Sequence, residues 1–292
     1  MYDQILVPTD GQPGTDDAVA RGLYLARTFD ATLHALFVVD TAVDGDLLDG
    51  DDTAVRDQLR SRGETALEDV REWGTDLSVE VVTELREGEP QAVICRYAAE
   101  TGVDLALMGT RARNTEESYI GSTTQRVLAG SPVPVVAVAL DDDSIPDPGY
   151  GAFDQVVIPT DGSEAAERAA THGLTIAEHY GADIRVVYVV DTTTHELADT
   201  SRSILGPLRE GGRHAVEAIA EQARDRHLPV STAMLEGTPA TEIRSYAGGT
   251  GADLVVIGTH GTGGSRKQLL GSTATRVLRG STVPVLTVNE RV

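Results

Sequence analysis

The residues best suited to chemistry lie in a glycine-rich stretch of the second half of the chain. This stretch, "GTHGTGGSRKQLLGST", holds four glycines in its first seven residues, then Arg266 and Lys267, and ends with Gly271, Ser272 and Thr273. Small residues let a backbone approach a ligand closely, and the amides at the start of a helix attract an anion. We therefore expect a phosphate site here. The alternative is that the glycines only turn the chain and Ser272 caps a helix.

A carboxylate at the end of an apolar run is the second candidate. Asp161 lies in "PTDG", directly after "DQVVI", where it could accept hydrogen bonds from ribose hydroxyls. Its alternative role is to cap a helix that starts near Ser163. Common nucleotide motifs do not explain the glycine-rich stretch. Gln268 follows Lys267 where a P-loop needs Ser or Thr, and no dinucleotide fingerprint follows the first strand.

An internal repeat organises the chain. "REGEPQAVICRYAAETGVDLALMGT" in the first half matches "LEGTPATEIRSYAGGTGADLVVIGT" in the second, and similar pairs cover most of both halves. The acidic stretch "DDDSIPDPGYGAF", rich in Pro and Gly, separates them as a linker would. We predict two domains, 1–140 and 154–292, joined by a linker at 141–153.

Each half alternates short apolar runs with longer amphipathic segments, which predicts an α/β fold with a parallel sheet. We expect each half to be an open, five-stranded α/β sandwich of the Rossmann-like kind. Ligands of such sheets bind beyond the carboxyl ends of the strands, where both candidate sites fall. In the second half we expect strands at 155–160, 183–190, 230–236, 253–258 and 284–288, and helices near 164–180, 203–227, 239–249 and 270–279.

Composition limits the possible partners and location. The net charge of −22 argues against a nucleic-acid partner, and Lys267 is the only lysine, a pattern expected of a protein in a high-salt cytoplasm. No apolar run reaches the roughly 18 residues of a membrane span, so we expect no membrane association and a cytoplasmic location. Cys95 is the single cysteine and forms no internal disulfide. The histidines show no metal-binding spacing, and we expect His172 and His179 on the surface.

At these motifs the sequence resembles the universal stress protein family, in a tandem two-domain form. ATP-binding members of that family carry G-x-x-G, nine residues, then G-[ST], and Gly258, Gly261, Gly271 and Ser272 match this spacing. The resemblance implies the adenine nucleotide alpha hydrolase-like fold. It also implies a bound adenine nucleotide, ATP, accompanied by a Mg²⁺ or Mn²⁺ ion, to which we assign no side-chain ligand. The second-half residues that it places at the nucleotide are Pro159, Thr160, Asp161, Val189, Ile257, Gly258, His260, Gly261, Arg266, Lys267, Gly271, Ser272 and Thr273.

The first half departs from the family pattern. Ala112 replaces the second glycine, the following gap is one residue shorter, and Glu116 and Glu117 bring negative charge that Arg111 and Arg113 only partly offset. We therefore expect this site to be weakened or empty. Its residues would be Pro8, Thr9, Asp10, Val38, Gly109, Arg111, Gly121, Ser122 and Thr123.

Three functions follow from these observations. The first is a regulatory stress-response protein that binds ATP mainly through its second domain, without catalysis. The second is a slow ATPase or nucleotidyl-transfer enzyme, for which His260 is the only obvious base in the loop. The third is a dimerisation scaffold that binds no nucleotide. The resemblance also implies that the halves pair through their last strands as an internal pseudo-dimer, and it allows a homodimer; it names no protein partner.

Overall fold

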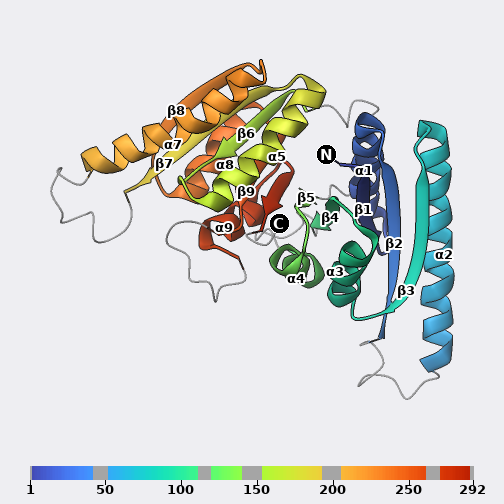
Figure 1. Ribbon diagram of the computed structural model, residues 1–292. Coiled ribbons are helices and arrows are strands. Elements are labelled where there is room, and N and C mark those ends of the chain that lie inside the picture. Colours follow the sequence, from blue (N-terminus) through green and yellow to red (C-terminus); the bar gives the residue numbers. More distant parts are fainter. Residues whose placement is uncertain are drawn as a thin grey trace. The chain divides into compact units, whose positions relative to one another are not determined.

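Two units make up the chain, Met1–Gly151 and Ala152–Val292, and each contains one parallel sheet with helices packed against it (Figure 1). The predicted linker lies outside the described residues except for Phe153, so the domain boundaries stay a prediction. The computed structural model describes residues 2–41, 52–110, 120–139, 153–192, 205–260 and 270–289.

The first unit alternates strands and helices along its whole described length. Carboxylate Oδ2 of Asp104 accepts the amides of Asp3 and Gln4 at 2.8 and 3.0 Å, which fixes the start of the first strand. The elements are β1 (Gln4–Thr9), a 3-10 turn η1 (Pro13–Thr15), α1 (Asp16–Phe29), β2 (Thr32–Asp40), α2 (Asp52–Leu77), β3 (Val81–Gly88), α3 (Pro90–Thr101), β4 (Leu105–Thr110), α4 (Ser122–Gly130) and β5 (Val135–Ala139).

The second unit repeats this order, including the carboxylate at its first strand. Asp253 Oδ2 accepts the amides of Asp154 and Gln155 at 3.0 and 2.9 Å. The expected strands and helices of this half agree with the observed ends to within two residues. The elements are β6 (Gln155–Pro159), α5 (Glu164–Tyr180), β7 (Asp183–Asp191), α7 (Leu205–Asp225), β8 (Val230–Gly237), α8 (Pro239–Thr250), β9 (Leu254–Gly258), α9 (Ser272–Gly280) and β10 (Val285–Val288).

Strand order identifies the edge where a ligand would bind. Neighbouring strands follow the order β3-β2-β1-β4-β5 in the first unit and β8-β7-β6-β9-β10 in the second, all pairs parallel. The direction of winding therefore reverses between β1 and β4, and between β6 and β9. Open α/β sheets bind ligands in the crevice at this switch point, beyond the carboxyl ends of the strands. The predicted fold class is confirmed.

Helix α5 shows how the sequence anchors this edge. The side chain of Ser163 accepts the amide of Ala166 at 3.2 Å as the N-cap, and Gly181 ends the helix at a φ of 70°. Between them, small residues including Ala165 and Gly173 are buried or nearly so, which lets the helix lie close to the sheet. The expectation that His172 is a surface residue is wrong. It lies half-buried on α5, and burial lowers its pKa to about 4.

Within the described residues, no helix has the length and apolar composition needed to cross a membrane.

Candidate functional site

Several of the predicted residues of the second unit lie at its switch point. Pro159 ends β6 and is followed by Thr160 and Asp161, while Ile257 and Gly258 end the neighbouring β9. The rim formed by these strand ends and by the start of α9 is called the second rim below.

The turn after β6 holds Asp161 in place. The amide of Thr160 donates to Val187 O at 2.9 Å, and the buried Thr160 hydroxyl accepts the amide of Gly162 at 3.1 Å. Asp161 is exposed, and its Oδ1 accepts the amide of Ser163 at 3.0 Å. Asp161 therefore shapes the turn, but the cap of α5 is Ser163.

The start of α9 presents backbone donors to the same rim. Gly271 is the N-cap residue, with no side-chain cap, so the alternative in which Ser272 caps the helix is wrong. The first amide bonded within the helix is that of Thr275, to Gly271 O at 3.0 Å. The amides of Ser272, Thr273 and Ala274 have no acceptor within the described part of the chain. Unpaired amides at the positive end of a helix dipole favour an anion.

Two of the glycines are also required by packing. A Cβ on Gly258 would lie 2.8 Å from the carbonyl carbon of Ala165 in α5, and one on Gly271 would lie 2.8 Å from Thr259 O. His260 is half-buried, and its Nδ1 lies 3.0 Å from the hydroxyl of Thr259, with which it shares a hydrogen bond. Gly261, Arg266 and Lys267 lie outside the described residues.

Strand β7 brings one predicted and one unpredicted side chain to this rim. Val189 is half-buried and lies two residues beyond Val187, which pairs with Pro159. Burial, together with the negative charge of Asp161, raises the pKa of Tyr188. Sequence reasoning missed Tyr188, although the aligned Phe37 marks the same position in the first half.

The first unit places its predicted residues in the same way. Pro8 and Thr9 end β1 next to Asp10, and Val38 is half-buried in β2. Gly109 lies in β4, and Gly121 is the N-cap of α4, which begins with Ser122 and Thr123. Arg111 lies outside the described residues, as do Ala112, Arg113, Glu116 and Glu117.

A groove of 640 Å³ between α1 and α2 adjoins the rim of the first unit. Asp16 and Asp69 contribute negative charge to its walls, and the pKa of Asp16 is raised by burial and by Asp17, Asp69 and Asp10. Arg62 lines the same groove and donates to Asp10 O at 2.6 Å. Sequence reasoning missed Arg62 as a site residue. The negative walls disfavour an anion near this rim.

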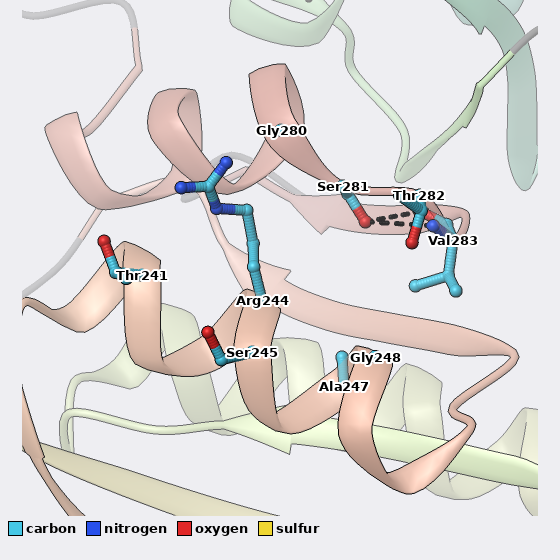
Figure 2. A pocket seen from close by; sticks show the side chains of 9 residues that line it. All are labelled: Thr241, Arg244, Ser245, Ala247, Gly248, Gly280, Ser281, Thr282 and Val283. Atoms are coloured by element: carbon cyan, nitrogen blue, oxygen red, sulfur yellow. Dashed lines mark hydrogen bonds between the residues drawn. The ribbon is translucent and has the colours of Figure 1, made fainter.

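A second pocket, of 220 Å³, lies between α8 and α9 and contains none of the predicted residues (Figure 2). Arg244 extends from α8 across Gly280, where a Cβ would meet its guanidinium, and its Nε donates to Ala240 O at 3.2 Å. A cation at the end of α9 complements the helix dipole. We assign Arg244 a packing role.

The described residues contain no group of three or more His, Cys, Asp or Glu side chains that could hold a metal ion.

Both halves of the chain match one known family. The family model described as "Universal stress protein family" matches residues 1–139 and again residues 152–289. The chain belongs to the universal stress protein family. The two matches also confirm the tandem form.

Individual relatives agree with this assignment. A universal stress protein of Methanocaldococcus jannaschii is 37% identical over 145 residues, which are 49% of this chain and 85% of the relative. A universal stress protein of Mycobacterium bovis is 27% identical over 220 residues, 74% of this chain and 72% of the relative. The crystal structure of a universal stress protein from Archaeoglobus fulgidus matches with a TM-score of 0.73 at 21% identity, covering 98% of this chain and 96% of that one. This last likeness concerns the fold.

Proposed function

We propose that this universal stress protein binds one adenine nucleotide, ATP, at the second rim, and that binding regulates the protein without fast catalysis. The observation that carries the proposal is the unpaired start of α9 beside the end of β9, at the switch point that also holds Asp161. The amides of α9 would bind the phosphates and Asp161 the ribose hydroxyls.

A divalent ion at this site would be held mainly by the bound nucleotide. Because the described residues offer no cluster of metal-binding side chains, phosphate oxygens and water would have to supply most ligands of a Mg²⁺ or Mn²⁺ ion. Such an ion would neutralise charge on the phosphates. The residues of the rim would bind and orient the nucleotide.

One difference supports binding in the second unit over the first. In the first unit Arg62 donates a hydrogen bond to Asp10 O, whereas the aligned position in the second half is Gly211, which has no side chain to reach Asp161 O. The acidic residues do not distinguish the two halves: Asp16 and Asp69 of the groove beside β1 align with Glu167 and Ala218, but Ser61 of the same groove aligns with Glu210.

The test is to denature the purified protein and count the released nucleotide per chain by chromatography and mass spectrometry. One ATP per chain is expected. Two per chain would overturn the asymmetry between the halves. None, even after incubation with Mg²⁺ and ATP, would overturn nucleotide binding and favour the scaffold function.

The enzyme alternative rests on His260, which is half-buried at the rim next to Thr259. A measurable ATPase rate that His260→Ala abolishes while ATP still binds would support it. The proposed binding function predicts no such rate in the parent protein. Pairing of the two last strands, and any homodimer, stay predictions of the family resemblance.

A further inference from the structure

Helix α7 contains a glycine that packing within the described chain does not require. Gly211 and Gly212 lie inside this helix, where a glycine costs roughly 0.5–1 kcal/mol relative to alanine. A Cβ on Gly212 would lie 2.6 Å from Cδ1 of Tyr188, so close packing explains that residue. A Cβ on Gly211 would meet no described heavy atom within 4 Å beyond its own helix. Among the described residues, no atom fills the space beside Gly211.

The internal repeat identifies the residue that corresponds to Gly211. Gly63 of α2 packs against the ring of Phe37, just as Gly212 packs against the ring of Tyr188. A Cβ on Gly63 would lie 2.5 Å from Cδ1 of Phe37. An ion pair one turn earlier confirms this register: Arg60 pairs with Glu87, and Arg209 pairs with Glu236. Arg62 therefore occupies the position of Gly211.

In the first unit, the side chain of Arg62 occupies the space that corresponds to the one beside Gly211. Its Nη2 donates to Asp10 O at 2.6 Å, and its Cζ lies 6.0 Å from the centre of the Phe37 ring. A Cβ on Gly11 would lie 3.5 Å from Cγ of Arg62 and 3.6 Å from Phe37.

The corresponding turn of the second unit is less crowded. A Cβ on Gly162 would meet only Ala215 within 4 Å, at 3.5 Å. Neither α7 at Gly211 nor the ring of Tyr188 reaches this position. The residues of α7 that these contacts concern, Gly211 and Ala215, are both small.

We propose that Gly211 leaves the nucleoside end of the second rim without a long side chain and that Arg62 narrows the same end in the first unit, where it lines the groove of 640 Å³. This inference rests on the proposed nucleotide site. A base and ribose need a flat space beside Asp161, and the bare backbone at Gly211 adds no side chain to that space. In the first unit, the guanidinium of Arg62 occupies part of the groove and donates to the main-chain oxygen of Asp10.

The experiment introduces an arginine into the second unit at the position that corresponds to Arg62. Gly211→Arg places a guanidinium where it can reach Asp161 O, as Arg62 reaches Asp10 O. Gly211→Ala is the matched control, because it also replaces a helical glycine with a good helix former but adds only a methyl group to the space beside the helix. Calorimetry would measure the affinity of each protein for Mg²⁺-ATP and, separately, for tripolyphosphate, which lacks a nucleoside. Thermal unfolding would check that both variants fold.

We expect Gly211→Arg to weaken ATP binding by at least about tenfold and to change tripolyphosphate affinity by less than about twofold. Gly211→Ala should keep both affinities. If the parent binds ATP and Gly211→Arg binds it equally well, this inference is overturned and the proposed function stands. An equal loss of ATP affinity in Gly211→Ala would also overturn it, because the effect would then come from the helix backbone. A parent that binds no ATP would overturn the inference and the proposed function together.

Discussion

The amide of Gly271 donates a hydrogen bond of 2.7 Å to the carbonyl oxygen of Thr259, which ties the start of α9 to the end of β9. Thr259 is fully buried, and its own amide donates to Val288 O at 3.0 Å. The two ends of the glycine-rich segment are therefore held together by the chain itself. A ligand at the second rim would meet a helix start that is already positioned, which lowers the entropy lost on binding.

Gly271→Ala tests this closure. The backbone of Gly271 has a φ of −61°, which alanine adopts without strain, so the expected effect is steric. The new Cβ would lie 2.8 Å from Thr259 O and would force α9 away from β9. We expect the free energy of unfolding to fall by about 1–3 kcal/mol, the usual range for overpacking, as measured by chemical denaturation.

Gly248→Ala is the control for that substitution. Gly248 lies in α8, and a Cβ there would meet no described atom within 4 Å outside its own helix, so stability should stay equal or rise slightly. Unchanged stability of Gly271→Ala, with loss of ATP binding, would show that Gly271 is needed for the ligand and not for closure.

Asp161→Asn tests the proposed ribose contact. Asparagine keeps an oxygen for the amide of Ser163 but loses the negative charge that strengthens a hydrogen bond from a hydroxyl. We expect ATP affinity to fall about tenfold to a hundredfold, because a hydrogen bond to a charged group contributes about 1.5–3 kcal/mol.

Asp10→Asn is the matched change in the first unit. Asp10 Oδ1 accepts the amide of Gln12 at 3.1 Å, so the local role is the same. ATP binding should not change, because we place the nucleotide in the second unit. Equal ATP affinity of Asp161→Asn and the parent would leave Asp161 as a turn-forming residue only.

The sequence predicts the strands, the helices and the rim because these depend on local pattern. Apolar runs that end in "PTDG" and "VVIGT" predict both the strands and the edge where they stop, and the switch point follows from strand order. Arg62 and Tyr188 were missed because their roles depend on which atoms meet across α2 and β2 or across α7 and β7. The aligned segments "RSRG" and "REGG" do carry the signal, since they set Arg62 against Gly211.

The burial of His172 is another feature that the sequence pattern does not predict. The amphipathic pattern of 164–180 predicts a helix, but it does not say how far the sheet and α7 cover each position on its sides. The half-burial of His172 therefore had to come from the packing.

Burial of two histidines predicts a loss of stability in mild acid. Burial lowers the pKa of His172 to about 4 and lowers the pKa of His34 from its ordinary value of 6.5, although Glu80 partly opposes the second shift. Below pH 6.5 the unfolded chain takes up protons that the folded protein does not, so these histidines destabilise the fold as the pH falls. Above pH 6.5 the effect vanishes.

His172→Gln measures this effect for the second unit. Comparing the free energies of unfolding at pH 7.5 and 4.5, we expect the parent to lose about 2 kcal/mol more than the variant. A variant with the same pH dependence as the parent would show that His172 is protonated in the folded state at pH 4.5.

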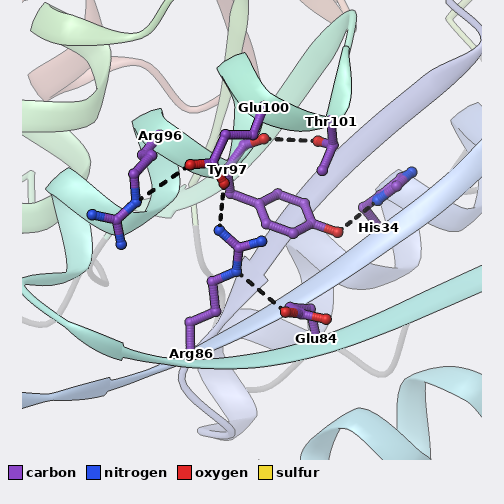
Figure 3. A network of polar contacts seen from close by, with 7 residues as sticks. All are labelled: His34, Glu84, Arg86, Arg96, Tyr97, Glu100 and Thr101. Atoms are coloured by element: carbon purple, nitrogen blue, oxygen red, sulfur yellow. Dashed lines mark hydrogen bonds and ion pairs between the residues drawn. The ribbon is translucent and has the colours of Figure 1, made fainter.

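Tyr97→Phe tests the polar network around His34 in the first unit (Figure 3). His34 Nε2 lies 2.7 Å from Gln4 Oε1, which can only accept, so Nδ1 accepts the hydroxyl of Tyr97 at 2.8 Å. Both side chains are buried, with 7% of His34 and 3% of Tyr97 exposed. Phenylalanine keeps the ring under Arg86, whose Cζ lies 4.6 Å from the ring centre. The substitution therefore removes only the hydroxyl and leaves a buried nitrogen unpaired.

We expect Tyr97→Phe to lower the free energy of unfolding by about 1–3 kcal/mol, the usual loss when a buried acceptor is left without a donor. Tyr246→Phe is the matched control, because Tyr246 holds the aligned position in α8 and its hydroxyl has no partner within the described residues. That variant should unfold like the parent. Equal losses in both variants would show that the loss of stability does not come from the hydrogen bond to His34.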